Sequence, residues 1–315
     1  MDNLTHTLVG AALGEAGLRR RTALATPTLL IGANLPDVDA AAYLWGSPVA
    51  LEWRRGWTHG VLAWVVLPLL LAGAMLGLAR LAERRGWRPA RPVRPGQLLL
   101  LAALAVWSHP LFDWLNTYGV RLLMPFSRRW FYGDTLFIVD PWLILMLGLG
   151  VALARRREGK GRADAVRPAR LALAAAAAYV VLNFAGTRAA KRAVEAANPT
   201  ARRVLAGPAI LAPHRRDLLV DEGAVYRTGT FGLLPGSGWA LDGPTIPTHA
   251  DGPAARLARA TPQGSAFLRW ARYPVFRADG DTLRISDARY TSRRAAWAAV
   301  AIPFGERPSS LPRRP

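Results

Sequence analysis

The chain has 315 residues, of which 51% are hydrophobic, and its formal net charge is +20. It contains no cysteine, which excludes disulfides and thiolate metal sites, so a bound metal would need His, Asp, Glu, backbone groups or water as ligands. A charge this positive often indicates nucleic-acid binding, but much of it lies between apolar runs. Residues 80–94 and 155–170 each contain six arginines. This pattern is typical of cytoplasmic loops in a multi-pass membrane protein, so we expect membrane lipid and no nucleic acid as partner.

The chain begins with two short apolar runs, residues 4–17 and 23–33, which are separated by three arginines at positions 19–21. Both runs are short for a span of about 20 residues. They are either short or tilted spans or a re-entrant helical hairpin. We prefer the spans, with the arginines at the cytoplasmic face, because a hairpin entering from outside would bury three arginines near the middle of the membrane.

Two aspartates, Asp37 and Asp39, follow a proline in a predicted loop. Carboxylates two residues apart can bind one cation or two adjacent cations. The alternative is an acidic turn, or an N-cap for the following residues 40–45.

A second group of polar residues precedes residues 61–79, which form an almost uninterrupted apolar run and the clearest predicted span. His59 lies at the mouth of this span, either as a ligand or as an ordinary interfacial side chain. Arg54 and Arg55 precede it, and they are either interfacial anchors or groups that bind a phosphate.

The next apolar run, residues 97–115, carries His109 and Asp113. Residues four apart lie on one face of a helix, so this pair can bind one divalent cation. The alternative is a His–Asp hydrogen bond in a buried helix, with Pro110 marking a kink.

The positive-inside rule places these residues together. If both arginine blocks are cytoplasmic, residues 61–79, 97–115, 135–154 and 171–186 cross the membrane in alternating directions. A set of ionisable residues then lies near the outer face: His6, Asp37, Asp39, His59, His109, Asp113 and Asp134. The spans were assigned without using these residues, so their convergence supports a metal site. Asp140, which is deeper and precedes a proline, is expected to support the ligands by hydrogen bonding.

The fold expected is therefore an α-helical polytopic membrane domain, a helix bundle of residues 1–186, followed by a small β-rich extracytoplasmic domain of residues 199–305. Residues 187–198 form an amphipathic helix that links the two, and residues 306–315 are expected to be disordered. Short strands between Pro, Gly and Asp turns are predicted at residues 209–212, 218–220, 224–230 and 271–277, with a hairpin turn at 278–281.

Several motifs resemble one bacterial family. They are Met-Asp-Asn-Leu-Thr-His6, Asn-Leu-Pro-Asp-Val-Asp39, Arg-Gly-Trp-Thr-His-Gly60, Ser-His-Pro-Leu-Phe-Asp-Trp-Leu-Asn-Thr-Tyr-Gly119 and Arg-Trp-Phe-Tyr-Gly-Asp134. In this order they resemble the metal-dependent hydrolases of the bacterial inner membrane, also described as LexA-regulated or LexA-binding. That family is distantly similar to zinc-dependent phospholipase C, in which His and Asp side chains on helices hold clustered zinc ions.

The resemblance implies metal-assisted hydrolysis of a phosphoester or lipid-like substrate at the outer face of the inner membrane. It implies one or two divalent ions, with zinc favoured over manganese or iron, held by His6, Asp37, Asp39, His59, His109 and Asp113. A free carboxylate, Asp39 or Asp134, would be the general base, and Arg54, Arg55 or Arg129 would bind the phosphate.

One departure from the phospholipase pattern limits the number of ions. A later His-x-x-x-Glu pair has no counterpart, because the remaining histidines, His214 and His249, lie in the tail without such a partner. The second hypothesis is a non-catalytic, metal-stabilised membrane protein with a structural or stress-response role. A transporter is least favoured, because the ionisable residues gather at one end of the spans.

Overall fold

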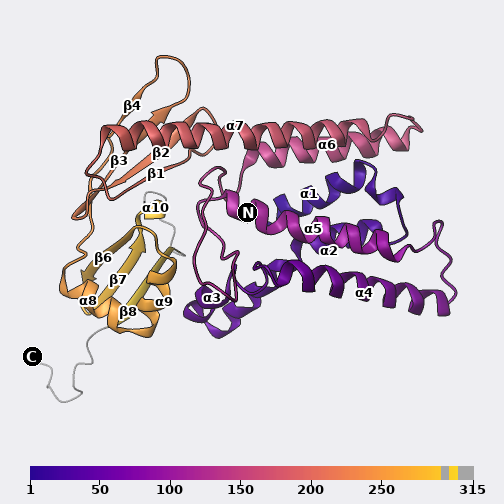
Figure 1. Ribbon diagram of the computed structural model, residues 1–315, viewed down its shortest axis with the longest axis horizontal. Helices are drawn as coiled ribbons and strands as arrows, with labels where there is room; N and C mark the ends of the chain where they lie inside the picture. Colours follow the sequence, from indigo (N-terminus) through magenta and orange to yellow (C-terminus); the bar gives the residue numbers. More distant parts are fainter. Residues whose placement is uncertain (292–297, 304–315) are drawn as a thin grey trace, which may run out of the picture.

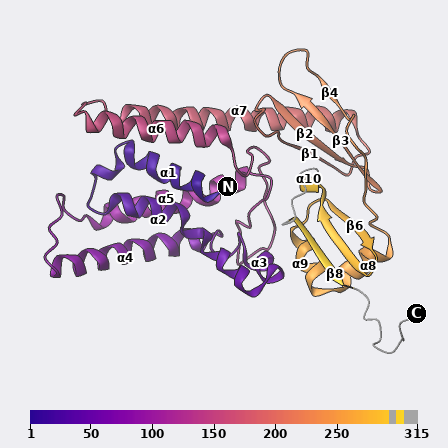
Figure 2. The same ribbon diagram turned by 180° about the vertical axis from the view of Figure 1, so that it is seen from behind.

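The computed structural model describes residues 1–291 and 298–303, and the predicted disordered segment 306–315 lies outside them. A helical N-terminal part is followed by a small antiparallel β-rich part, as the sequence predicts (Figures 1 and 2). The helical part consists of α1 (Asn3–Glu15), η1 (Leu18–Arg20), α2 (Ala25–Asn34), η2 (Leu35–Trp45), α3 (Ser47–Trp53), α4 (Ala63–Arg84), α5 (Pro95–Leu115), α6 (Pro141–Gly159) and α7 (Arg167–Ala197).

Three of the six predicted spans coincide with described helices that are long and apolar enough to cross a membrane, namely α4, α5 and α7. The helices α1 and α2 have 13 and 10 residues. At a rise of about 1.5 Å per residue they are shorter than the roughly 30 Å hydrocarbon layer, so neither can cross it alone. The two short helices pack against each other. The helix α6, which covers the predicted span 135–154 in part, ends in a charged segment that includes Arg156 and Arg157.

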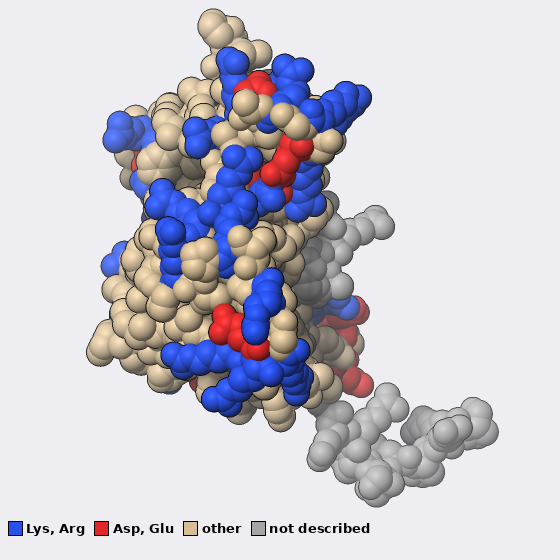
Figure 3. Space-filling view, turned by 90° about the vertical axis from the view of Figure 1, so that its right-hand side faces the viewer, with Lys and Arg blue, Asp and Glu red and all other residues tan. Residues whose placement is uncertain are grey.

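The connections at one end of the helical part carry the arginines of the sequence blocks. Figure 3 views this end and shows a concentration of Lys and Arg with few acidic residues between them. Ion pairs tie the connections together: Arg19 pairs with Glu158, and Arg155 lies 3.0 Å from Glu15. The positive charge is therefore gathered at one end of the helices, as the positive-inside pattern predicts.

A close approach between α2 and α5 is set by small residues. A Cβ atom added to Gly32 would lie 2.8 Å from the Cβ of Ala105, so only glycine allows the two helices to approach this closely. The contact brings the backbone of Ala33 against α5 and fixes the position of one histidine described below.

The helix α7 runs without interruption from Arg167 to Ala197, so the predicted amphipathic segment 187–198 is its continuation. Its last turns carry Ala190 and Val194, which pack on Val204 and Val220 of the first sheet. One continuous helix thus joins the two parts of the molecule (Figure 1).

The β-rich part has two antiparallel sheets. The first contains β1 (Arg203–Pro208), β2 (Arg215–Asp221), β3 (Val225–Gly232), β4 (Trp239–Ala240) and β5 (Ile246–Pro247). The second contains β6 (Pro274–Asp279), β7 (Thr282–Asp287) and β8 (Ala299–Pro303), with the helices α8 (Pro253–Ala260), α9 (Pro262–Trp270) and α10 (Ala288–Thr291) beside it.

The predicted hairpin is confirmed, because Asp279 pairs with Thr282 across the turn. The predicted strand at 209–212 is wrong. These residues form a turn, in which Ala212 N donates to Ala209 O and Leu211 has a φ of +60°. The apolar side chains suggested a strand, but these residues form the connection between two paired strands, β1 and β2.

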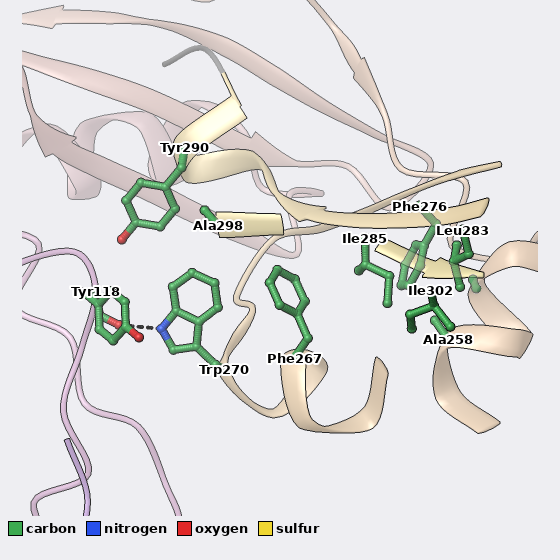
Figure 4. Close-up of a cluster of buried hydrophobic side chains, with 11 residues drawn as sticks. Tyr118, Ala258, Phe267, Trp270, Phe276, Leu283, Ile285, Tyr290, Ala298 and Ile302 are labelled. Atoms are coloured by element: carbon green, nitrogen blue, oxygen red, sulfur yellow. Dashed lines mark hydrogen bonds between the residues drawn. The ribbon is translucent and has the colours of Figure 1, made fainter. Parts of the chain in front are cut away.

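The core of the second sheet includes a residue from the helical part. Figure 4 shows Phe267 of α9 beside Ile285 and Trp270 on its other side, with Tyr118 reaching in from the loop after α5. The Tyr118 and Trp270 rings are 4.9 Å apart, and the Trp270 indole N–H donates to Tyr118 O at 3.2 Å. The C-terminal domain therefore rests directly on the loop that leaves the end of α5.

Candidate metal centre

Four predicted ligands converge at the end of the helices opposite the arginine-rich connections. Asp37 comes from η2, His59 from the turn before α4, and His109 and Asp113 from successive turns of α5. One ligand atom from each lies within 4.8 Å of the others. The side chains of His59, His109 and Asp113 have no solvent exposure. The helical spacing of the last two places them on one face, as predicted.

A backbone carbonyl fixes the tautomer of His109. Its Nδ1 lies 2.7 Å from Ala33 O, and a carbonyl oxygen can only accept, so Nδ1 carries the proton. In the neutral imidazole, the form that binds a metal, Nε2 then carries the lone pair. It lies 3.5 Å from Asp113 Oδ2 and 3.7 Å from Asp37 Oδ1. A ring held through one nitrogen with the other turned inward is the usual arrangement of a metal-binding histidine.

His59 is held in the same way by a hydroxyl. The Thr58 hydroxyl donates its one proton to Asp39 Oδ2 at 2.9 Å, so its oxygen is left to accept from His59 Nδ1, also at 2.9 Å. The Nδ1 atom is also 3.3 Å from Asp39 Oδ2. The Nε2 lone pair of His59 then points at Asp113 Oδ2, 3.2 Å away.

With both imidazoles neutral, these inward atoms are all acceptors. His59 Nε2, His109 Nε2 and Asp113 Oδ2 are buried and have no hydrogen-bond partner in the described chain. Buried polar atoms without a partner are costly, and lone pairs facing one another repel. A divalent cation between them would remove both costs. Two imidazole nitrogens and two carboxylates fit zinc, and also manganese or iron.

The second oxygen of Asp113 is bound to cationic groups. Arg55 Nη2 lies 3.0 Å from Oδ1, and the Met1 amino group also contacts Oδ1. Arg55 is buried, and its Nη1 donates to Asn116 Oδ1 and Gly119 O, each at 3.3 Å. A phosphate would therefore have to compete for Arg55 with the protein groups that hold its guanidinium on Asp113.

His6 adjoins the group of four without being part of it. Its ring stacks on that of His109 at 3.7 Å, and its Nε2 lies 3.5 Å from Asp113 Oδ1. Both ring nitrogens are buried and lack a hydrogen-bond partner within the described residues. His6 is thus placed where it could contribute to a second ion.

Asp39 and Arg54 lie on the outer side of the centre. Asp39 Oδ2 accepts from the backbone N–H of Arg55 at 2.7 Å, whereas Oδ1 is buried, has no hydrogen-bond partner in the described part of the chain and lies 3.8 Å from Arg54 Nε. Arg54 is 3.4 Å from Asp37 Oδ1 and about 20% exposed.

Residues 1–190 match the sequence model of the family described as YdjM inner membrane protein. The chain belongs to this family. The YdjM match covers the helices α1 to α6, most of α7 and every residue of the candidate centre. The β-rich part lies beyond it.

A relative of the YdjM-family chain was found in Bacillus subtilis (strain 168). It is the uncharacterized protein YfhP, 27% identical over 157 residues, which make up 46% of this chain and 43% of YfhP. The match thus spans less than half the length of that relative. No solved structure matches the chain. The expected similarity to zinc-dependent phospholipase C is not supported by these comparisons, whereas the inner-membrane family is.

Three other predicted residues of this YdjM-family protein lie elsewhere. Asp134 pairs with Arg272 of the C-terminal domain at 2.7 Å. Asp140 caps α6 by accepting from the N–H groups of residues 142 and 143, and it also accepts from the Tyr179 hydroxyl, so its contacts are to α6 and α7. Arg129 lies over the Phe131 ring at 5.5 Å. The centre of four is therefore assembled without them.

The centre also uses groups that the sequence prediction did not name. Thr58 fixes the tautomer of His59, and Asn116 Oδ1 accepts from Tyr118 N at 2.8 Å while it holds Arg55. Both lie within motifs that resemble the family: Thr58 directly precedes His59, and Asn116 follows Asp113 by three residues. Their place in these motifs is the sequence signal that could have identified them. The carbonyl of Ala33 gives no sequence signal, because every residue has one.

Proposed function

We propose that this protein is a membrane-embedded, metal-dependent hydrolase that cleaves a phosphoester. The observation that carries the proposal is the buried group of acceptors: His59 Nε2, His109 Nε2 and Asp113 Oδ2 face one another without hydrogen-bond partners among the described residues, and Asp37 lies beside them. Membership of an inner-membrane family and three apolar helices support the membrane location.

One divalent ion, with zinc favoured over manganese or iron, would be held by Asp37, His59, His109 and Asp113. Such an ion acts as a Lewis acid and lowers the pKa of bound water to about 7. His6 would be recruited if a second ion binds, because its ring nitrogens are adjacent and have no hydrogen-bond partner among the described residues.

The protein's own groups supply the remaining functions. Asp39 uses Oδ2 to orient His59 through Thr58, while Oδ1 accepts no hydrogen bond from the described residues, so Oδ1 can accept a proton from water as a general base. Arg54 is the better candidate for binding the substrate anion, because it is partly exposed and its Nε lacks a hydrogen-bond partner in the described chain. Arg55 instead positions Asp113. Asp134 is the weaker candidate for the base, because it pairs with Arg272 of the C-terminal domain and contacts none of the four ligands in the described chain.

We further propose a multi-pass topology in which the arginine-rich end is cytoplasmic. The candidate centre and the C-terminal domain would then lie on the extracytoplasmic side. A reporter fused after Pro315 should behave as extracytoplasmic, and one inserted at Gly86 as cytoplasmic. Opposite results at both positions would place the centre in the cytoplasm and contradict a substrate in the outer leaflet.

A non-catalytic, metal-stabilised protein with a structural or stress-response role is the second candidate. It is favoured by the number of protein ligands: four are available, and three of them have no solvent exposure. Structural zinc sites usually have four protein ligands, whereas catalytic sites keep one position open. A metal-loaded protein whose ion is closed by four side chains, and which hydrolyses no phosphoester, would establish this alternative.

The decisive experiment measures metal content and hydrolysis together. Protein purified in detergent should contain about one divalent ion and should hydrolyse a phosphodiester, with both properties lost in His109→Ala. His214→Ala is the matched control, because His214 lies in the turn before β2, within the β-rich part. If His214→Ala lowers the metal content and His109→Ala does not, the assigned centre is wrong.

A further inference from the structure

An apolar groove opens beside the metal centre. It is formed by η2, α3 and the turn that carries Trp57 and Thr58, and its volume is about 470 Å³. Two of its wall residues, Asp39 and Thr58, are the residues that orient His59. The groove and the metal centre therefore share a wall.

The rest of the groove is hydrophobic, and much of it is exposed. The lining residues other than Asp39 and Thr58 are Val38, Ala41, Ala42, Trp45, Val49, Trp53 and Trp57. Trp45 is 69% exposed, and Trp53 and Trp57 are about half exposed. Tryptophan side chains gather at the membrane–water interface, where an apolar surface of this kind is in contact with lipid. The α4 span begins only a few residues later, at Ala63, so the groove lies where the chain enters the membrane.

We propose that this groove holds an acyl chain of a phospholipid, and that such a phospholipid is the substrate; this proposal rests on the hydrolase function proposed above. A lipid of this class has an apolar chain joined to an anionic phosphate. The structure has the matching order of surfaces: the apolar groove, then partly exposed Arg54, then the acceptors of the metal centre. Arg54 lies 3.8 Å from Asp39 on the shared wall, where it would meet the phosphate.

The reaction needs no further reactant. Water adds to the phosphorus atom, the ester P–O bond breaks, and the departing oxygen takes a proton, which gives an alcohol and a phosphomonoester. Asp39 Oδ1 is available to receive the proton that the attacking water loses. The acyl chain takes no part in these bonds, so the groove would act through binding and positioning of the substrate.

The test uses monomeric phosphatidylcholines of increasing chain length and a short, water-soluble nitrophenyl phosphodiester. Wild-type kcat/KM should rise roughly threefold to fourfold for each added methylene until the groove is full, which is the usual gain for burying a CH₂ group. Ala42→Trp fills the groove and should flatten this dependence, while the activity on the short diester and the metal content stay unchanged. Ala74→Trp, on an exposed position of α4, is the matched control and should behave as wild type.

The outcomes separate the two proposals. If the short diester is hydrolysed but chain length has no effect, or if Ala42→Trp retains the chain-length dependence, the acyl groove is refuted and the hydrolase remains. If metal-loaded protein hydrolyses neither compound, the hydrolase fails, and with it the phospholipid substrate. If Ala42→Trp changes the oligomeric state of the protein in detergent, the groove holds a second copy of the chain, which also overturns the lipid assignment.

Discussion

Replacing Asp113 by Asn should destabilise the protein even when no metal is present. Asp113 is fully buried, and its Oδ1 is paired with Arg55 and with the Met1 amino group. Asparagine has nearly the same shape, so packing is retained, whereas the negative charge is lost and one acceptor oxygen becomes an N–H donor. Arg55 would then be a buried cation without its carboxylate.

The size of the effect follows from the partners that remain. Removing one member of a buried ion pair usually costs about 3–5 kcal/mol of unfolding free energy. Arg55 would keep its hydrogen bonds to Asn116 and Gly119 and its position 4.5 Å over the Tyr118 ring, so we expect about 3 kcal/mol, the lower end of that range. With metal at 100 times its dissociation constant, wild-type protein gains about 2.7 kcal/mol that the variant should lose. The difference therefore nearly doubles when metal is added.

The assay is unfolding in detergent, measured with and without added zinc or a chelator, together with metal analysis. Asp37→Asn is the matched control. Asp37 pairs with Arg54, which is partly exposed and also lies near Asp39, so the metal-free loss should be smaller than that of Asp113→Asn. The metal-dependent part should be lost in both variants. Metal-free Asp113→Asn as stable as wild type, or wild-type stability unaffected by chelator, would refute the reasoning.

Three further predictions concern the surroundings of the centre. Trp270→Phe removes the indole N–H bond to Tyr118 O and leaves a cavity in place of the larger buried ring, so it should cost at least about 1 kcal/mol in the stability of the C-terminal domain, measured by limited proteolysis, without loss of metal. Gly32→Val should push α2 from α5, displace the Ala33 carbonyl from His109 and weaken metal binding in a titration, whereas an unchanged affinity would contradict the close-packing argument. Burial alone would raise the pKa of Asp287, but the charge of Arg289 and its hydrogen bonds hold that pKa below the usual value, so its stabilisation should be present above about pH 4 and lost on further acidification. Asp287→Asn should reduce this pH dependence, and an unchanged acid transition would refute it.

The sequence by itself determined the class of protein and most of the candidate centre. Apolar run length identified α4, α5 and α7 as candidate spans, and the arginine blocks indicated which helix ends lie together. The spacing of His109 and Asp113 was sufficient to place both on one helical face, because an α-helix repeats every 3.6 residues. The hairpin between β6 and β7 was also readable, since its turn residues are local signals.

Only the tertiary structure decided how the predicted residues divide their roles. Arg54 and Arg55 are adjacent in sequence, yet the φ of +51° at Arg55 belongs to a turn that buries its side chain on Asp113 and leaves Arg54 partly exposed. Asp39 supports His59 from the side opposite Asp113, which residue spacing could not reveal because it depends on how η2 packs near α5. The tautomers of both histidines, and hence the free lone pairs on which the metal site rests, depend on Ala33 O and the Thr58 hydroxyl, whose positions are fixed by helix packing and by the turn before α4.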